Sequence, residues 1–99
     1  MCKVFVEYAI NPEGRASYLI YMQELQSREG RLELLEGTDQ PGLFVEIWTD
    51  ITYAEYEVLK RKRTQQVEDS EDQAKWDQWI KGGLSKLHMW HFTQVTPQK

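Results

Sequence analysis

Two glutamates have the clearest potential for chemistry. Glu7 and Glu46 each lie in a run that alternates apolar and polar residues, which predicts a strand. The alternation places both carboxylates on one face of a sheet together with three aromatic residues: Phe5, Phe44 and Trp48. Neighbouring carboxylates in apolar surroundings raise each other's pKa, so one of them can serve as a general base toward a phenol or enol. The alternative is a polar cluster at a subunit interface, paired with Lys3, Lys86 or a histidine.

The only two histidines, His88 and His91, are three residues apart in a predicted strand, 86–95. Residues at that spacing face opposite sides of a strand, so the pair does not form one metal site there. We expect His91 either to be a core histidine with a satisfied hydrogen bond or to face a pocket beneath the helices as a base or ligand. His88 shares its face with Trp90 and can pair with Glu7 across adjacent strands.

Aromatic residues make up the candidate ligand-binding set: Tyr8, Trp48, Tyr56, Trp76 and Trp79. Such side chains between helices and a sheet suit a flat, apolar ligand. The alternative is an ordinary aromatic core. No GxGxxG, P-loop, HExxH or cysteine pair is present, so the sequence predicts no cofactor and no metal.

The order of patterns positions these residues. Strand patterns cover 3–10, 31–37, 43–49 and 86–95, and helix patterns cover 12–27, 52–66 and the stretch from Ser70 to Gly82-Gly83. Asn11-Pro12 and two capping boxes, Thr52 with Glu55 and Ser70 with Gln73, mark the helix starts. This predicts one α+β domain over 1–99: a ferredoxin-like β-α-β-β-α-β order with a split second helix and a four-stranded antiparallel sheet.

The two clearest predicted strands, 3–10 and 43–49, carry large apolar residues on both faces, and this pattern has a consequence for assembly. We expect the helices to cover an aliphatic face: Val4, Val6, Ile10, Leu43, Val45 and Ile47. The opposite face would then carry five aromatic residues: Phe5, Phe44, Trp48, Trp90 and Phe92. Because an exposed patch of this kind is unusual for a monomer, we expect a second copy to cover it about a two-fold axis. The alternative is a loop or the C-terminal tail folded over the patch.

Composition narrows the class of protein. The 99 residues are 40% hydrophobic with a net charge of -4, which suits a folded soluble domain and argues against nucleic acid as the main partner. The basic run Lys60-Arg61-Lys62-Arg63 is expected to be a solvated helix end. No stretch is long and apolar enough for a membrane, and the single cysteine, Cys2, excludes an internal disulfide. We therefore expect a cytoplasmic protein.

Three segments resemble the dimeric α/β-barrel superfamily, which includes the antibiotic-biosynthesis-type monooxygenases: Val4–Ile10 leading to Asn11-Pro12-Glu13, Leu43–Trp48, and Tyr53-Ala54-Glu55-Tyr56. The resemblance implies a homodimeric barrel and a cofactor-independent, oxygenase-like enzyme that acts on an aromatic or quinone-like compound. The alternative that it also implies is a non-catalytic ligand-binding or structural dimer. Haem binding is less favoured, because haem-degrading relatives use a helix histidine and the predicted helices here contain none.

Overall fold

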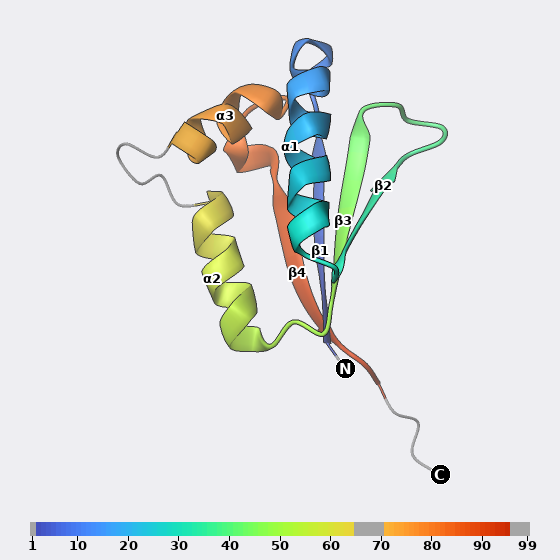
Figure 1. Ribbon diagram of the computed structural model, residues 1–99, viewed down its shortest axis with the longest axis vertical. Coiled ribbons are helices and arrows are strands. Elements are labelled where there is room, and N and C mark those ends of the chain that lie inside the picture. Colours follow the sequence, from blue (N-terminus) through green and yellow to red (C-terminus); the bar gives the residue numbers. More distant parts are fainter. Residues whose placement is uncertain (1, 65–70, 96–99) are drawn as a thin grey trace.

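The computed structural model describes residues 2–64 and 71–95, without the side chains of 71–73. These residues form four strands, three α-helices and two short 3-10 turns (Figure 1). In chain order they are β1 (Cys2–Ala9), η1 (Pro12–Gly14), α1 (Arg15–Arg28), β2 (Leu32–Glu36), β3 (Leu43–Thr49), α2 (Tyr53–Thr64), α3 (Glu71–Trp79), η2 (Leu84–Lys86) and β4 (His88–Thr93). The predicted α+β class and the order of elements are confirmed.

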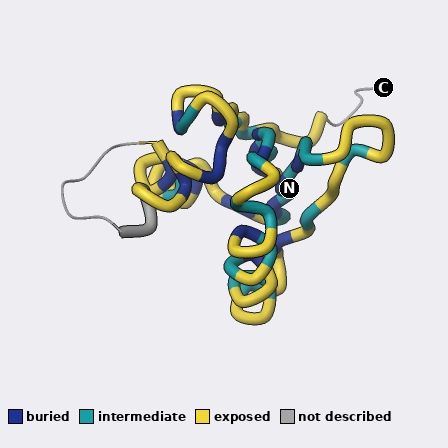
Figure 2. The backbone as a smooth tube through the Cα atoms, turned by 90° about the horizontal axis from the view of Figure 1, so that it is seen from above, coloured by how far each residue is buried: buried dark blue, intermediate teal, exposed yellow. Residues whose placement is uncertain are grey.

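The four strands form one antiparallel sheet in the order β2-β3-β1-β4. This arrangement is compatible with a ferredoxin-like fold. The register places Val6 of β1 between Glu46 of β3 and Met89 of β4. The α1 helix lies in front of the sheet and runs along the direction of the strands, and α2 and α3 lie on the β4 side of it (Figure 1). Buried positions gather in the middle of the molecule, whereas the β2–β3 loop is exposed (Figure 2).

Local signals explain where the helices begin. Thr52 and Glu55 form the predicted capping box, because the Glu55 N–H donates to Thr52 Oγ1 at 3.1 Å and the Thr52 N–H donates to Glu55 Oε1 at 3.1 Å. Asn11 differs from the prediction, since its side chain makes no cap hydrogen bond. It donates instead to the Gln78 carbonyl at 3.0 Å and ties the start of the first helix to the end of α3. The second capping box, Ser70 with Gln73, falls outside the described residues.

Two glycines turn the chain after α3. Gly82 and Gly83 have φ values of 80° and 84°, a left-handed region that costs glycine little. The helix ends at Trp79, just before them, as their position predicts. The turn leads through η2 into β4, which returns along β1.

The inner face of β3 is the main correction to the sequence-based expectation. Val4 and Val6 of β1 and Ile10 directly after it are buried, as predicted. On β3 we expected Leu43, Val45 and Ile47 beneath the helices, which is wrong, since the buried residues there are Phe44, Glu46 and Trp48. The reason is the register: Val4 pairs with Trp48 and Val6 with Glu46, and directly opposite residues share a face. A shift by one residue would exchange the two faces.

The other side of the sheet, which we call the open face, follows from the same register. Its apolar residues are Phe5, Ala9, Leu35, Leu43, Val45, Ile47, Trp90 and Phe92. Phe5, Trp90 and Phe92 were predicted there, whereas the placement of Phe44 and Trp48 on this face was wrong. Trp90 is 43% exposed and Phe92 is 51% exposed. The described helices leave this face uncovered.

Candidate functional site

A group of buried polar side chains lies between the sheet and the helices, and we call it the Glu46 cluster. It contains five residues: Tyr8 of β1, Tyr18 of α1, Glu46 and Trp48 of β3, and Arg63 of α2. Tyr8, Glu46 and Trp48 reach it because all three occupy inward positions of paired strands. Arg63 reaches it from the last turn of α2. Glu46 is 0% exposed and Arg63 is 6% exposed, so the charges of both are removed from water.

Every carboxylate oxygen of Glu46 accepts two hydrogen bonds. Arg63 binds in a forked manner, with Nη1 donating to Oε2 at 2.7 Å and Nη2 donating to Oε1 at 2.9 Å. The Trp48 indole N–H donates to Oε1 at 2.9 Å, and the Tyr8 hydroxyl donates to Oε2. Forked guanidinium–carboxylate pairs are among the strongest hydrogen-bonded arrangements in proteins. The carboxylate is therefore held from three directions.

A second layer of contacts surrounds this pair. The hydroxyl oxygens of Tyr8 and Tyr18 are 2.7 Å apart, and because the Tyr8 proton is directed at Glu46, Tyr18 must donate to Tyr8. The guanidinium carbon of Arg63 lies 4.3 Å from the centre of the Trp76 ring, a cation–π contact. The rings of Tyr8 and Tyr18 meet Trp76 edge-on, at centroid distances of 5.3 Å and 5.7 Å. The charges are thus enclosed by aromatic rings.

Burial and charge determine the ionisation of this cluster. Burial, with the charge of Glu46 as the next cause, raises the pKa of Tyr8 well above its usual range. Burial likewise raises the pKa of Tyr18. Burial alone would lower the pKa of Arg63, but the charge of Glu46 and its hydrogen bonds raise it. Among the described residues, every buried side-chain nitrogen and oxygen has a partner. The cluster is therefore a neutralised charge pair with two neutral phenols, and it offers no unpaired base.

The expected pairing of Glu7 with Glu46 is wrong. Glu7 lies on the open face, where its register partners are Val45 of β3 and His88 of β4, whereas Glu46 points to the helices. The two carboxylates therefore lie on opposite sides of the sheet. His88 does lie directly across from Glu7, as expected, and its ring stacks on Trp90 with a centroid distance of 6.0 Å.

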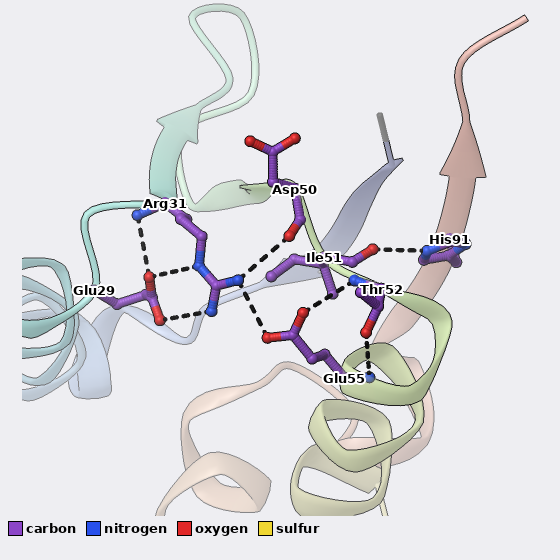
Figure 3. Close-up of polar contacts among 7 residues, drawn as sticks. All are labelled: Glu29, Arg31, Asp50, Ile51, Thr52, Glu55 and His91. Atoms are coloured by element: carbon purple, nitrogen blue, oxygen red, sulfur yellow. Dashed lines mark hydrogen bonds and ion pairs between the residues drawn. The ribbon is translucent and has the colours of Figure 1, made fainter.

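His91 is a half-buried histidine with a satisfied hydrogen bond. Its Nε2 lies 2.9 Å from the Ile51 carbonyl oxygen (Figure 3). Its ring lies 5.4 Å from the ring centres of both Tyr53 and Tyr56. This is the core alternative given by the sequence pattern, and it places Tyr56 against β4. The contact joins β4 to the turn that precedes α2.

An arginine network that the sequence did not reveal holds the same turn from the other side. Arg31 donates to both carboxylate oxygens of Glu29 at 2.9 Å and 3.1 Å, to Glu55 at 3.2 Å and to the Asp50 carbonyl at 3.3 Å (Figure 3). Asp50 has a φ of 58°, which is uncommon for a residue other than glycine. The network thus connects the end of α1, the start of β2 and the turn that precedes α2.

Trp76 and Trp79 fill the space between the helices and the sheet that the sequence pattern offers as a ligand site. Their ring centres are 5.5 Å apart, and Tyr21 lies 5.7 Å and 5.6 Å from them. Tyr18 also contacts Trp79, at 6.0 Å. Both tryptophans are buried. The packing of these side chains favours the core alternative for the aromatic set.

An open hollow lies elsewhere, between the end of α2, α3 and η2. Its lining residues are Thr64, Asp77, Gly82, Leu84, Ser85 and Leu87. The Asp77 carboxylate already accepts a hydrogen bond from the Leu84 N–H at 3.0 Å. The polar lining is thus partly used to hold the turn before β4.

Arg63 and Tyr18 are the residues of the Glu46 cluster that sequence reasoning missed. Arg63 was missed because we expected the whole run Lys60–Arg63 to be a solvated helix end. That expectation is wrong for Arg63, which is buried. A signal was present: Tyr56, Leu59 and Arg63 follow the i, i+3, i+7 spacing of one helix face, and the first two pack toward the core. A single charge on a core-facing stripe indicates a buried partner of opposite charge.

A second forked ion pair lies at the surface and gives a pH-dependent prediction. Arg15 of α1 donates to both carboxylate oxygens of Glu36 of β2 at 2.6 Å and 2.8 Å. These hydrogen bonds, with one from the Gly42 N–H, lower the pKa of Glu36 from 4.5 to about 2. Because the folded pKa lies below the unfolded value, the unfolded state binds more protons in this range. The contribution of the pair is therefore present above pH 4.5 and is lost as the pH falls toward about 2.

We expect the stability advantage of the wild-type protein over Glu36→Gln to shrink as the pH falls through this window. Urea denaturation at several pH values measures the advantage, and an NMR titration of the Glu36 carboxyl carbon measures its pKa directly. In the control variant Arg15→Gln the pKa of Glu36 should return toward its ordinary value. A wild-type Glu36 that titrates near 4.5 would contradict this account.

Comparison with known proteins adds no relative. No protein-family model matches the chain, and no curated protein or solved structure is significantly similar to it. Within 2–64 and 71–95, no group of three or more His, Cys, Asp or Glu side chains is placed to hold a metal ion. No helix in that part of the chain is both long enough and apolar enough to cross a bilayer.

Proposed function

We propose that the protein is a homodimer of the dimeric α/β-barrel type, assembled through the open face, and that it acts as a non-catalytic ligand-binding or structural dimer. The observation that carries this proposal is the apolar character of the open face. Of its apolar residues, Leu35, Trp90 and Phe92 are exposed and the others are half-buried. Apolar surface of this extent on one side of a sheet is the usual mark of an interface.

The size of the open face suits a stable dimer. Four strands about 4.8 Å apart and about 20 Å long give a footprint of roughly 400 Å2, and the accessible surface of the side chains on it is larger. This is of the order of the ~800 Å2 that each partner buries in a standard interface. Two such faces pack about 10 Å apart with interdigitated side chains.

A second copy is the favoured occupant because the open face carries charges of both signs. Lys3 and Glu7 of β1 and Glu33 of β2 all point to this side. A two-fold axis brings the same patch against itself, so a face with mixed charge can be complementary to its own copy. Among the described residues after β4, Val95 is 86% exposed and does not pack on this face.

The interior supports the non-catalytic alternative over an oxygenase-like one. An enzyme that oxidises an aromatic or quinone-like compound needs space for the substrate beside a base. Here the Glu46 carboxylate accepts four hydrogen bonds and rings occupy the space near Trp79. Oxygen uptake with a panel of hydroquinones distinguishes the two alternatives, and we expect none above the uncatalysed rate. Added haemin should likewise give no protein-bound Soret band.

The dimer is tested by sedimentation velocity between about 1 and 100 μM, together with tryptophan fluorescence on dilution. We expect a species of twice the chain mass. Trp90 is the one exposed tryptophan of the four, so its emission should shift to the red as the dimer dissociates. A monomer throughout this range, with red-shifted Trp90 emission, would contradict the proposal.

A further inference from the structure

We propose that the Glu46 cluster is a binding site for a guanidinium group, and that the chain fills this site with its own Arg63. The inference does not depend on the dimer, because the cluster lies on the opposite side of the sheet. The ligand class is a monosubstituted guanidinium, the head group of arginine and of small alkylguanidines. Three features of the cluster support this assignment: its hydrogen bonds, its aromatic wall and its origin in the fold.

The carboxylate is oriented by residues other than Arg63. The Trp48 indole holds Oε1 at 2.9 Å, the Tyr8 hydroxyl holds Oε2, and Tyr18 holds Tyr8 at 2.7 Å. These donors leave the remaining lone pairs of both oxygens directed at the two guanidinium nitrogens of Arg63. The carboxylate fork that a planar guanidinium needs is therefore oriented by donors other than Arg63.

The aromatic wall provides the second element of recognition. The Trp76 ring covers the face of the guanidinium at 4.3 Å, and Tyr8 and Tyr18 support that ring edge-on. A cation gains more from such a ring when water is excluded, and Glu46 is fully buried. A flat cation between a carboxylate fork and an indole is the arrangement that selects guanidinium over ammonium.

The site and its occupant come from different elements. The fork and its support belong to β1, α1 and β3, whereas Arg63 enters from the last turn of α2, and Thr64 after it is exposed. Arg63 thus occupies the Glu46 cluster as a ligand that is tethered to the chain. A free guanidinium ligand would take the place of the Arg63 side chain at the end of α2.

The experiment uses the full-length chain with Arg63→Ala and methylguanidinium as the probe. We expect saturable binding with a Kd on the order of 1 mM, the range for so small a ligand. The NMR signal of the Trp48 indole N–H should move with ligand concentration, because it donates to Glu46. The melting temperature of the variant should rise with the same ligand dependence.

Matched controls make the result specific. Methylurea has the planar shape without the charge, and methylammonium has the charge without the fork, so neither should bind comparably. The control variant is Arg15→Ala. Arg15 is an exposed arginine that also makes a forked pair with a glutamate and lies 5.5 Å from the centre of the Phe44 ring. We expect this variant to show no saturable binding of methylguanidinium. Equal binding by Arg15→Ala would overturn the proposal.

Two further outcomes would also overturn it. The first is a folded Arg63→Ala variant whose Trp48 signal and melting temperature do not respond to methylguanidinium. The second concerns an Arg63→Ala variant that is unfolded in buffer. We expect methylguanidinium, and not methylurea, to restore its structure as followed by circular dichroism. If methylguanidinium does not restore the structure, the proposal that the Glu46 cluster recognises a guanidinium group is wrong.

Discussion

Replacing Arg63 by methionine should lower the free energy of unfolding by about 3–5 kcal/mol. The methionine fills a similar volume but leaves the Glu46 carboxylate in the interior without a counter-charge. Tyr8 and Trp48 still donate to it, yet two hydrogen bonds and the positive charge are lost. For a domain of 99 residues, a loss of this size is a large share of a typical total stability.

Urea denaturation followed by far-ultraviolet circular dichroism measures this loss. The matched control is Arg15→Met, since Arg15 makes a forked pair with Glu36 at the surface, where water screens the charges. We expect a much smaller loss there. An Arg63→Met variant as stable as Arg15→Met would show that the buried pair contributes little.

The double variant Arg63→Met with Glu46→Gln separates charge from packing. Removing both charges together should restore part of the stability lost in Arg63→Met, because no unpaired charge then remains buried. The interaction energy of the cycle should differ clearly from zero, as expected for groups in direct contact. Simple addition of the two single losses would be evidence against coupling through the ion pair.

The second large effect concerns the open face. Replacing Ile47 by lysine should weaken the proposed dimer by about 100-fold or more, so that the variant sediments as a monomer at about 10 μM. Ile47 lies on β3 beside Phe5 of β1, in the central strands of this face. In a two-fold dimer each substitution places a charge against an apolar surface, and the change occurs twice.

Ile20→Lys is the matched control for this prediction. Ile20 is 62% exposed on α1, in the helical layer on the other side of the sheet. We expect this variant to remain a dimer with unchanged affinity. Unfolding curves of both variants serve to test whether a loss of fold is the cause. If both substitutions had the same effect on sedimentation, the interface would not be the open face.

Local sequence signals predicted much of the fold. The bounds of β3, the capping box of Thr52 with Glu55, and the opposite faces of His88 and His91 all follow from short-range patterns. Each depends on interactions within a few residues, such as side-chain alternation along one strand or a reciprocal hydrogen bond across one helical turn. Such interactions can be predicted from a short stretch of the sequence, because both partners lie within it.

The candidate site was not predictable in this way, because its parts are distant in the sequence. Both faces of β3 are apolar, so alternation alone does not say which one faces the helices. The choice depends on the pairing of Val6 with Glu46 and on the arrival of Arg63 from α2. The sequence by itself determined the elements and their order. Only the tertiary structure decided that Glu46 lies inside, because the cost of burying its charge is offset by a guanidinium 17 residues away.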